Sequence, residues 1–143
     1  MKNKNSMTVT FSSLPVNEAF ARMAVSAFIM PLDPTVSEIT DIKTAVSEAV
    51  TNSIIHGYDG LSGDIVLLCS YEGREIHIEI SDRGRGIADI KTAMTPLYTS
   101  RPELERSGLG FTVMETFMDS LKVESHPGEG TKVIMSKKLS DGE

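Results

Sequence analysis

Several kinds of residue and segment are scarce in this chain. It has one cysteine, Cys69, and no tryptophan, and aromatic residues make up 6% of it. A single cysteine cannot form a disulfide within the chain, so a buried thiol in a reducing compartment is expected. No apolar run approaches the length of a membrane span, and Lys2 and Lys4 are not followed by the apolar core of an export signal. The sequence therefore predicts a cytoplasmic protein that does not enter the membrane.

Positive charge is also in short supply. The chain has 14 Lys and Arg residues against 20 Asp and Glu residues, which gives a net charge of −6. Because a nucleic-acid backbone needs a basic face, direct binding to nucleic acid is not expected. Two familiar ATP signatures are missing as well, the G-x-x-x-x-G-K-S/T loop and the kinase H-R-D segment. If this chain handles ATP, it must hold the phosphates in another way.

The 143 residues, 40% hydrophobic and 24% charged, are typical of one globular domain, taken here as residues 1–143. Periodicity predicts a terminal edge strand, two helices of which the second opens with a capping box at Thr35 and Glu38, a hairpin, a third helix and a last hairpin. The edge strand is expected at 7–12, and the first helix is expected to end at Pro31 and Pro34. The second helix is expected at 35–56 and the third at 109–119, with hairpins of 64–71 with 75–81 and of 121–125 with 132–136. This order predicts an α/β two-layer sandwich, with helices on one face of a mixed, mostly antiparallel sheet. Residues 137–143 are expected to be a flexible tail.

The first helix is expected to bury one stripe and expose another. Its predicted apolar stripe is Phe20, Met23, Ala24, Ala27 and Phe28. Glu18, Arg22 and Ser26 run down the opposite face, and either Ser13 or Asn17 could cap the helix. Arg22 has two interpretations, an ion pair with Glu18 or a contact to a partner protein.

A polar row is the most informative feature of the second helix. Glu48, Asn52 and His56 follow one another at intervals of four along the edge of an apolar stripe that consists of Ile39, Ile42, Val46, Ala49, Val50 and Ser53. Alone, such a row is often a solvated flank. His56 with Gly57 would suit a helix C-terminus, and His56 is also a candidate nucleotide-binding residue. The row is followed, however, by Asp82-Arg83-Gly84-Arg85-Gly86 and by Gly108-Leu109-Gly110. An acidic residue and Asn one turn apart, then D-x-G-x-G, then G-x-G, is much more specific than any part alone.

These three segments resemble the ATP site of the gyrase, Hsp90, histidine-kinase and MutL superfamily. With Glu48–Asn52, Ile54–Tyr58 and Pro102–Phe111, the chain is similar in particular to the anti-sigma serine kinases of the sporulation type. The resemblance extends from about Val9 to about Ser136. It implies a Bergerat-type ATP-binding fold that binds ATP or ADP with Mg²⁺.

The residue types suit the roles that the resemblance implies for the base and the metal. Asn52 offers a neutral oxygen to Mg²⁺, which otherwise keeps waters and phosphate oxygens. Asp82 closes a strand, where its carboxylate can accept a hydrogen bond from the adenine amino group, and Gly84 and Gly86 let the backbone bend beside the base. The resemblance implies that Thr131 supports Asp82.

The phosphates and the chemical step are assigned to other segments. Ser107, Gly108, Leu109 and Gly110 lie at a helix start, where exposed amides suit an anion. Residues 95–108 are expected to be an ATP lid, with Arg106 as the contact to the terminal phosphate and Arg101 as a weaker candidate. Glu48 is the candidate base that accepts the proton of an incoming hydroxyl.

The partners are implied by the resemblance alone. They are a sporulation sigma factor, bound by a homodimer with Arg22 as a candidate contact, and an anti-anti-sigma protein that is phosphorylated on serine. Two alternatives stay open, an anti-sigma kinase for a stress-response sigma factor and a nucleotide-gated binding module that transfers no phosphate. A conformational ATPase of the gyrase or Hsp90 kind would need a transducer domain.

Overall fold

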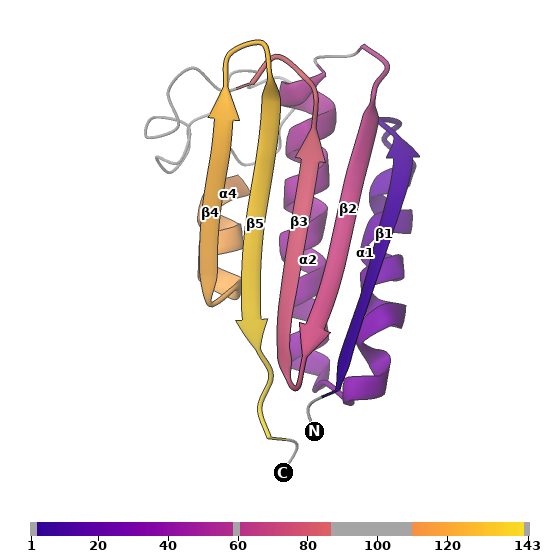
Figure 1. Cartoon of the computed structure of the whole chain (residues 1–143), viewed down its shortest axis with the longest axis vertical. Helices are drawn as coiled ribbons and strands as arrows, with labels where there is room; N and C mark the ends of the chain where they lie inside the picture. Colours follow the sequence, from indigo (N-terminus) through magenta and orange to yellow (C-terminus); the bar gives the residue numbers. More distant parts are fainter. Residues whose placement is uncertain (1–2, 59–60, 87–109, 142–143) are drawn as a thin grey trace.

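One antiparallel sheet organises the chain. The structure, a computed structural model, describes residues 3–58, 61–86 and 110–141. Its five strands stand in the order β1-β2-β3-β5-β4 (Figure 1). Their bounds are β1 Lys4–Ser12, β2 Asp64–Glu72, β3 Glu75–Asp82, β4 Ser120–His126 and β5 Gly130–Lys138.

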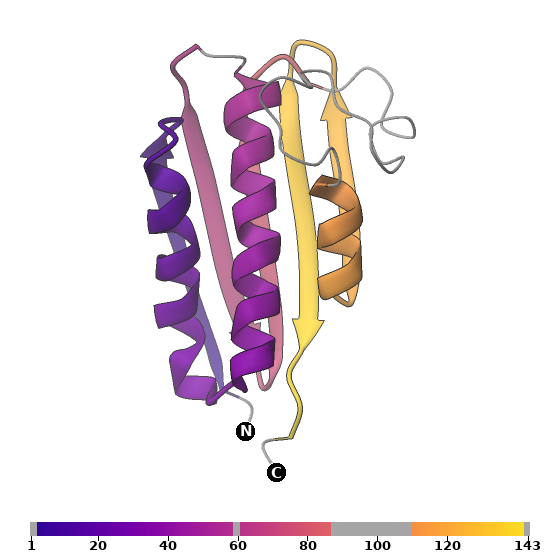
Figure 2. The same cartoon turned by 180° about the vertical axis from the view of Figure 1, so that it is seen from behind.

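Every pairing between these strands is antiparallel, so the expected parallel component of the sheet is absent from the described residues. The connection from β1 to β2 explains why. Two helices lie between these strands, one leading away from the end of β1 and the other leading back, so β2 starts where β1 ended (Figure 2).

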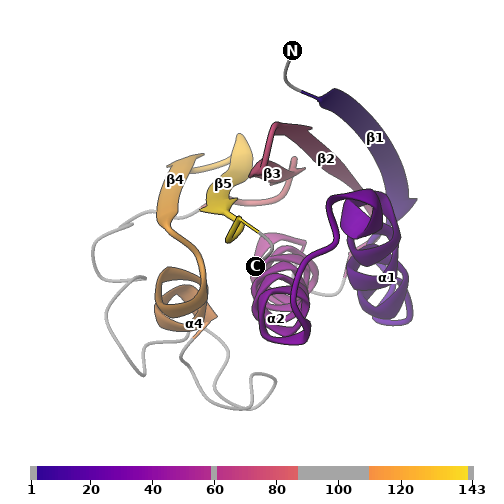
Figure 3. The same ribbon diagram turned by 90° about the horizontal axis from the view of Figure 1, so that it is seen from below.

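The helices cover one face of the sheet and leave the other open, as the view along the strands shows (Figure 3). Their bounds are α1 Asn17–Ile29, η1 Met30–Leu32, α2 Val36–Asn52, η2 Ser53–Gly57 and α4 Gly110–Phe117. The two-layer arrangement predicted from the sequence is therefore confirmed. Within the described part of the chain, no helix is both long and apolar enough to cross a membrane.

The core lies between α2 and the central strands. Ile76, Ile78 and Ile80 alternate along β3 and are fully buried, as the period-two pattern predicts. From α2, Ile42, Val46, Ala49 and Val50 pack against them and are equally buried, and Ser53 is almost so. This burial fixes which way α2 faces, and it places the polar row at the edge of the core.

The predicted face of α1 is wrong. The buried residues are Ala21, Val25, Ser26 and Ile29, whereas Phe20 is 48% exposed and Met23 is 55% exposed. Apolar residues surround this helix, so two stripes compete, and the smaller side chains of the observed stripe suit a helix that packs closely on α2. Ser26 tolerates burial because its hydroxyl donates to Arg22 O at 2.9 Å.

Neither proposed cap of α1 is used. Val16 holds the N-cap position and makes no side-chain hydrogen bond there. The Asn17 side-chain amide instead donates to Ser12 O at 2.9 Å, which ties the helix start to the end of β1.

The two ends of α2 differ from each other. The capping box is confirmed: Glu38 N donates to Thr35 Oγ1 at 3.1 Å and Thr35 N donates to Glu38 Oε1 at 2.8 Å. At the other end the α-helix stops at Asn52 and continues as the π turn η2, which closes where Tyr58 N donates to Ser53 O at 3.0 Å. Gly57 therefore lies inside this wider turn and is not the left-handed cap that the sequence suggests.

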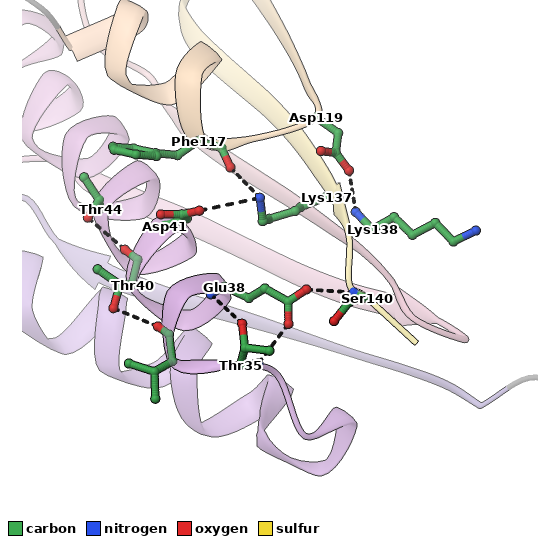
Figure 4. A network of polar contacts seen from close by, with 11 residues as sticks. Thr35, Glu38, Thr40, Asp41, Thr44, Phe117, Asp119, Lys137, Lys138 and Ser140 are labelled. Carbon is green, nitrogen blue, oxygen red and sulfur yellow. Dashed lines mark hydrogen bonds and ion pairs between the residues drawn. The ribbon is translucent and has the colours of Figure 1, made fainter. Parts of the chain in front are cut away.

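The end of β5 is held against the start of α2 (Figure 4). Ser140 N donates to Glu38 Oε2 at 2.7 Å, and Lys137 Nζ donates to Phe117 O at 2.8 Å and lies 3.8 Å from Asp41 Oδ2. The tail expected from residue 137 thus includes the last two residues of β5 and, at position 139, a leucine that is only 2% exposed.

Candidate functional site

The polar row lies where α2 passes into η2. Glu48 and Asn52 occupy the last turns of α2 and His56 lies in η2, and all three are partly buried. Because Glu48 and Asn52 are one turn apart, they share one face of the helix. Ala49 and Val50 beside them are fully buried, so the row follows the rim of the core.

Asp82 is a buried carboxylate at the end of β3. It is 7% exposed, and its Oδ1 accepts a hydrogen bond from Gly84 N at 2.9 Å. Its Oδ2 is buried and has no partner among the described residues. A buried polar atom without a partner costs about 1–3 kcal/mol, and such atoms are rare in folded proteins. Asp82 Oδ2 is therefore the acceptor that a bound ligand with a hydrogen-bond donor would satisfy.

Glycines bring this carboxylate against the end of η2. A Cβ atom at position 57 would lie 2.9 Å from Asp82 Oδ2, and one at position 84 would lie 2.1 Å from Gly57 O. Gly86, with a φ of 76°, approaches the backbone of His126 equally closely. Only glycine leaves room at these positions, so the D-x-G-x-G segment packs directly on the helix that carries Glu48 and Asn52.

Two hydrogen bonds from Arg85, one from its backbone and one from its side chain, join the two segments further. Arg85 N donates to Gly57 O at 2.8 Å, and Arg85 Nε donates to His56 O at 2.8 Å. His56 thus contributes its carbonyl oxygen to the junction. Whether its ring also acts on a ligand stays a prediction.

Thr131 lies opposite Asp82 in the pairing of β3 with β5. Its hydroxyl is 2.8 Å from that of Ser125, which itself donates to Gly130 O at 3.0 Å. Either hydroxyl can be the donor between Thr131 and Ser125. Ser125 is buried, and the sequence analysis missed it; its signal is its place opposite Thr131 in the last hairpin.

Some predicted residues cannot be placed at this site. Arg101, Arg106, Ser107, Gly108, Leu109 and the expected lid, residues 95–108, lie outside the described residues, while Gly110 is the first residue of α4. Arg22 lies on α1, where its Nε is 3.1 Å from Glu18 Oε2. The simpler interpretation of Arg22, an ion pair within the helix, is therefore observed.

The side chains near the polar row suit a magnesium ion that is held mainly by phosphate oxygens and water. No group of three or more His, Cys, Asp or Glu side chains that could hold a metal occurs in residues 3–58, 61–86 and 110–141. One neutral amide oxygen, from Asn52, fits a cation that keeps most of its waters and binds phosphate oxygens.

The open face of the sheet has its own polar cluster. His77 Nε2 lies 2.7 Å from Glu79 Oε2, and this hydrogen bond lowers the pKa of Glu79, with help from Lys132. A shallow groove on that face, lined by Lys4, Ser70, Glu72, Glu75, His77 and their neighbours, includes none of the candidate residues. His77 and Glu79 thus lie on the face of the sheet opposite the helices.

The fold and the site together define a nucleotide-binding domain of the histidine kinase-like ATPase class. The family model of the histidine kinase-like ATPase domain matches residues 11–137. The crystal structure of the RsbU and RsbW domains of Rv1364c from Mycobacterium tuberculosis has a similar fold, with a TM-score of 0.68 at 20% identity. That match covers 94% of this chain and 32% of the other.

Relatives narrow the class. The anti-sigma F factor of Clostridium novyi (strain NT) is 62% identical over 136 residues, which are 94% of this chain and 95% of the relative. That of Clostridium kluyveri (strain NBRC 12016) is 60% identical over 133 residues, or 93% and 94% of the two chains. The chain belongs to the anti-sigma F factor family of histidine kinase-like ATPase domains.

Proposed function

We propose that this chain binds and inhibits a sporulation sigma factor of the sigma-F type and, with Mg-ATP, phosphorylates a serine of an anti-anti-sigma protein. The observation that carries the nucleotide part is Asp82 Oδ2, which is buried beside the end of η2 and has no hydrogen-bond partner among the described residues. An ATPase domain of this class implies nucleotide binding. The sigma factor follows from the names of the relatives.

In this proposal the two oxygens of Asp82 have different tasks. Oδ1 is engaged by Gly84 N, so Oδ2 is the oxygen that accepts the adenine amino hydrogen. Adenine carries a donor at C6 where guanine carries an acceptor, so this arrangement favours ATP over GTP.

Asn52 and Glu48 serve the phosphate half. Asn52 offers its side-chain oxygen to Mg²⁺, and the bound ion supplies neutralisation of phosphate charge. Glu48, one turn earlier on the same face, accepts the proton of the serine hydroxyl. The serine oxygen at the same time forms a bond to the γ-phosphorus. The bond from that phosphorus to the β-phosphate oxygen breaks, and ADP leaves. Arg106 and the segment Ser107–Gly110 would bind the phosphates.

Arg22 is the proposed contact to the sigma factor. Its side chain is 38% exposed, and it presents the cation of an ion pair whose carboxylate, Glu18, also contacts Ser47 on α2. A partner could therefore bind the pair without opening it. Arg22→Glu should weaken sigma capture and leave nucleotide binding intact; capture at wild-type strength would remove Arg22 from the interface.

The apolar outer face of α1 supports a homodimer. Large apolar side chains exposed on α1 and its flanks are Leu14, Val16, Phe20, Met23 and Met30. Phe20 packs edge to face on Phe11 of β1, with ring centroids 6.0 Å apart, and β1 is an edge strand. Because such a face is costly to leave in water, we propose that a second copy of the chain covers it, together with the β1 edge.

Charge on this face should disrupt the dimer. The double variant Val16→Glu with Met23→Glu should shift the mass measured by light scattering toward the monomer, while Ile42 and the rest of the core are untouched. The matched control is Val36→Glu, an exposed valine at the start of α2. A dimer that survives the double variant would place the interface elsewhere.

Phosphate transfer is the test of the kinase proposal. The purified chain is incubated with Mg²⁺, ATP labelled in the γ-phosphate and the cognate anti-anti-sigma protein, and label on serine is measured. Sigma-F capture is measured on the same sample. Capture without label transfer would favour the nucleotide-gated binding module, and capture of a stress-response sigma factor alone would favour that kind of kinase.

A further inference from the structure

Tyr58 has no part in the chemistry proposed above, yet its hydroxyl lies inside the site. The residue follows η2 directly and is 9% exposed. Its hydroxyl donates to Asp64 O at 2.6 Å and accepts from Arg83 N at 2.8 Å. One hydroxyl thus connects the end of η2, the start of β2 and the residue that follows Asp82.

The acceptor role matters more, because Arg83 N belongs to the peptide bond that leaves Asp82. Each of the three successive backbone amides after Asp82 donates a hydrogen bond. Arg83 N donates to Tyr58 Oη, Gly84 N to Asp82 Oδ1 and Arg85 N to Gly57 O. Two of these three acceptors come from residues 57 and 58. The end of η2 therefore sets the turn that fixes where Asp82 Oδ2 points.

The tyrosine ring cannot move to another position easily. A Cβ atom at position 63 would lie 2.2 Å from Tyr58 Cε1, so the ring packs directly on Gly63. Its backbone closes the π turn through the bond from Tyr58 N to Ser53 O. The position of the hydroxyl is thus determined by the end of α2 on one side and by the start of β2 on the other.

We propose that Tyr58 is a positioning residue for adenine recognition: its hydroxyl holds the Asp82–Arg83 peptide so that Asp82 Oδ2 faces the amino group of the base. This rests on the proposed function, in which Asp82 binds adenine. Tyr58 touches neither the nucleotide nor the metal in this account. Its removal should change the affinity for ATP, and the preference over GTP, through Asp82.

Tyr58→Phe tests the proposal, because it removes the hydroxyl and keeps the ring on Gly63. Dissociation constants for Mg-ATP and Mg-GTP are measured by calorimetry, with thermal unfolding as a check on the fold. Losing an ordinary hydrogen bond corresponds to about 3–10-fold in an equilibrium constant. We expect ATP affinity and the ratio of ATP to GTP affinity both to fall by about that factor.

The matched control is Tyr71→Phe, at the other end of β2, where the ring packs on Phe28 with centroids 5.3 Å apart. It should leave both constants unchanged. In an Asp82→Asn background, Tyr58→Phe should cause no further change in the ratio, because Tyr58 acts only through Asp82. If Tyr58 merely stabilises the fold, Tyr58→Phe lowers the melting temperature and the ratio stays at its wild-type value, which would overturn the proposal.

A second measurement needs no variant. Amide hydrogen exchange on the wild type should show protection of Arg83 N–H, although the Arg83 side chain is exposed. Exchange at the rate of an open amide would contradict the hydrogen bond and the proposal with it. If the wild type binds no ATP at all, the proposed function fails; if it binds ATP and only the Tyr58 result is negative, this inference alone fails.

Discussion

The two ends of α2 show opposite treatments of polar groups. At its start, Glu38 receives hydrogen bonds from Thr35 N and Ser140 N, and Lys137 pairs with Asp41 and Phe117 O (Figure 4). At its other end, glycines hold the backbone close to Asp82 and leave one buried carboxylate oxygen without a described partner. The first end is held by hydrogen bonds within the fold, whereas the second has a buried acceptor that no described residue satisfies.

Arg74 lies near the start of α2, which we call the closed end, and it contacts Leu32 and Ser140 there. Its Nη1 donates to Leu32 O at 2.7 Å and its Nε donates to Ser140 O, so the β2–β3 hairpin holds both η1 and the end of the chain. Its Nη2 is buried and has no partner among the described residues. That nitrogen shares a guanidinium that already makes two hydrogen bonds, whereas Asp82 Oδ2 lies against the helix that carries the polar row.

The largest expected effect is on serine phosphorylation, from a change at Glu48 near the C-terminal end of α2. Glu48→Gln keeps the size of the side chain and removes its charge and basicity. If Glu48 is the base, serine phosphorylation should fall by about 10²–10⁴-fold while ATP binding and sigma capture survive. The matched control is Glu115→Gln on the exposed side of α4. Full transfer activity in Glu48→Gln would exclude Glu48 as the base.

At the closed end, Arg74→Leu should act on stability alone. It removes two hydrogen bonds from a charged donor and leaves the carbonyls of Leu32 and Ser140 without it. We expect the free energy of unfolding to fall by about 2–4 kcal/mol, measured in denaturant, with ATP affinity unchanged below the transition. Arg83→Leu is the control, because it also removes one positive charge but from an exposed side chain. A loss of ATP affinity in Arg74→Leu would show that the two ends are coupled.

The smallest expected effect is on the pH dependence of the unfolding free energy, through Glu38. Burial acts to raise the pKa of Glu38, but hydrogen bonds from Ser140 and Thr35 outweigh it, so the pKa is lowered from 4.5. A carboxylate with a lowered pKa in the folded state contributes stability that is present above its unfolded pKa and is lost as pH falls through the folded pKa. Glu38→Gln should therefore flatten the fall in unfolding free energy below about pH 4.5. An identical slope in the variant would contradict this.

Much of the fold and part of the candidate site could be predicted from the sequence, because the patterns that indicate them are local. The capping box at Thr35, the alternating isoleucines of β3 and the glycines after Asp82 each depend on residues close together in the chain. The face of α1 could not be predicted, since apolar residues surround that helix and only packing against α2 selects Ala21 and Val25 over Phe20 and Met23. The contact from Tyr58 to Arg83 joins residues 25 positions apart, and no local pattern indicates it. The π turn, although it closes locally from Tyr58 N to Ser53 O, was not predicted either.

The most direct test of the nucleotide site is calorimetric titration of the wild type and Asp82→Asn with Mg-ATP and Mg-GTP. In the variant the amide oxygen keeps the hydrogen bond from Gly84 N, so the amide nitrogen takes the place of Oδ2 and presents a donor to the adenine amino group. ATP affinity should then fall by about 10–100-fold, and the preference for ATP over GTP should shrink or reverse, because guanine carries an acceptor at that position. Unchanged affinity and unchanged preference would contradict the account and leave Asp82 as a residue that only forms the turn.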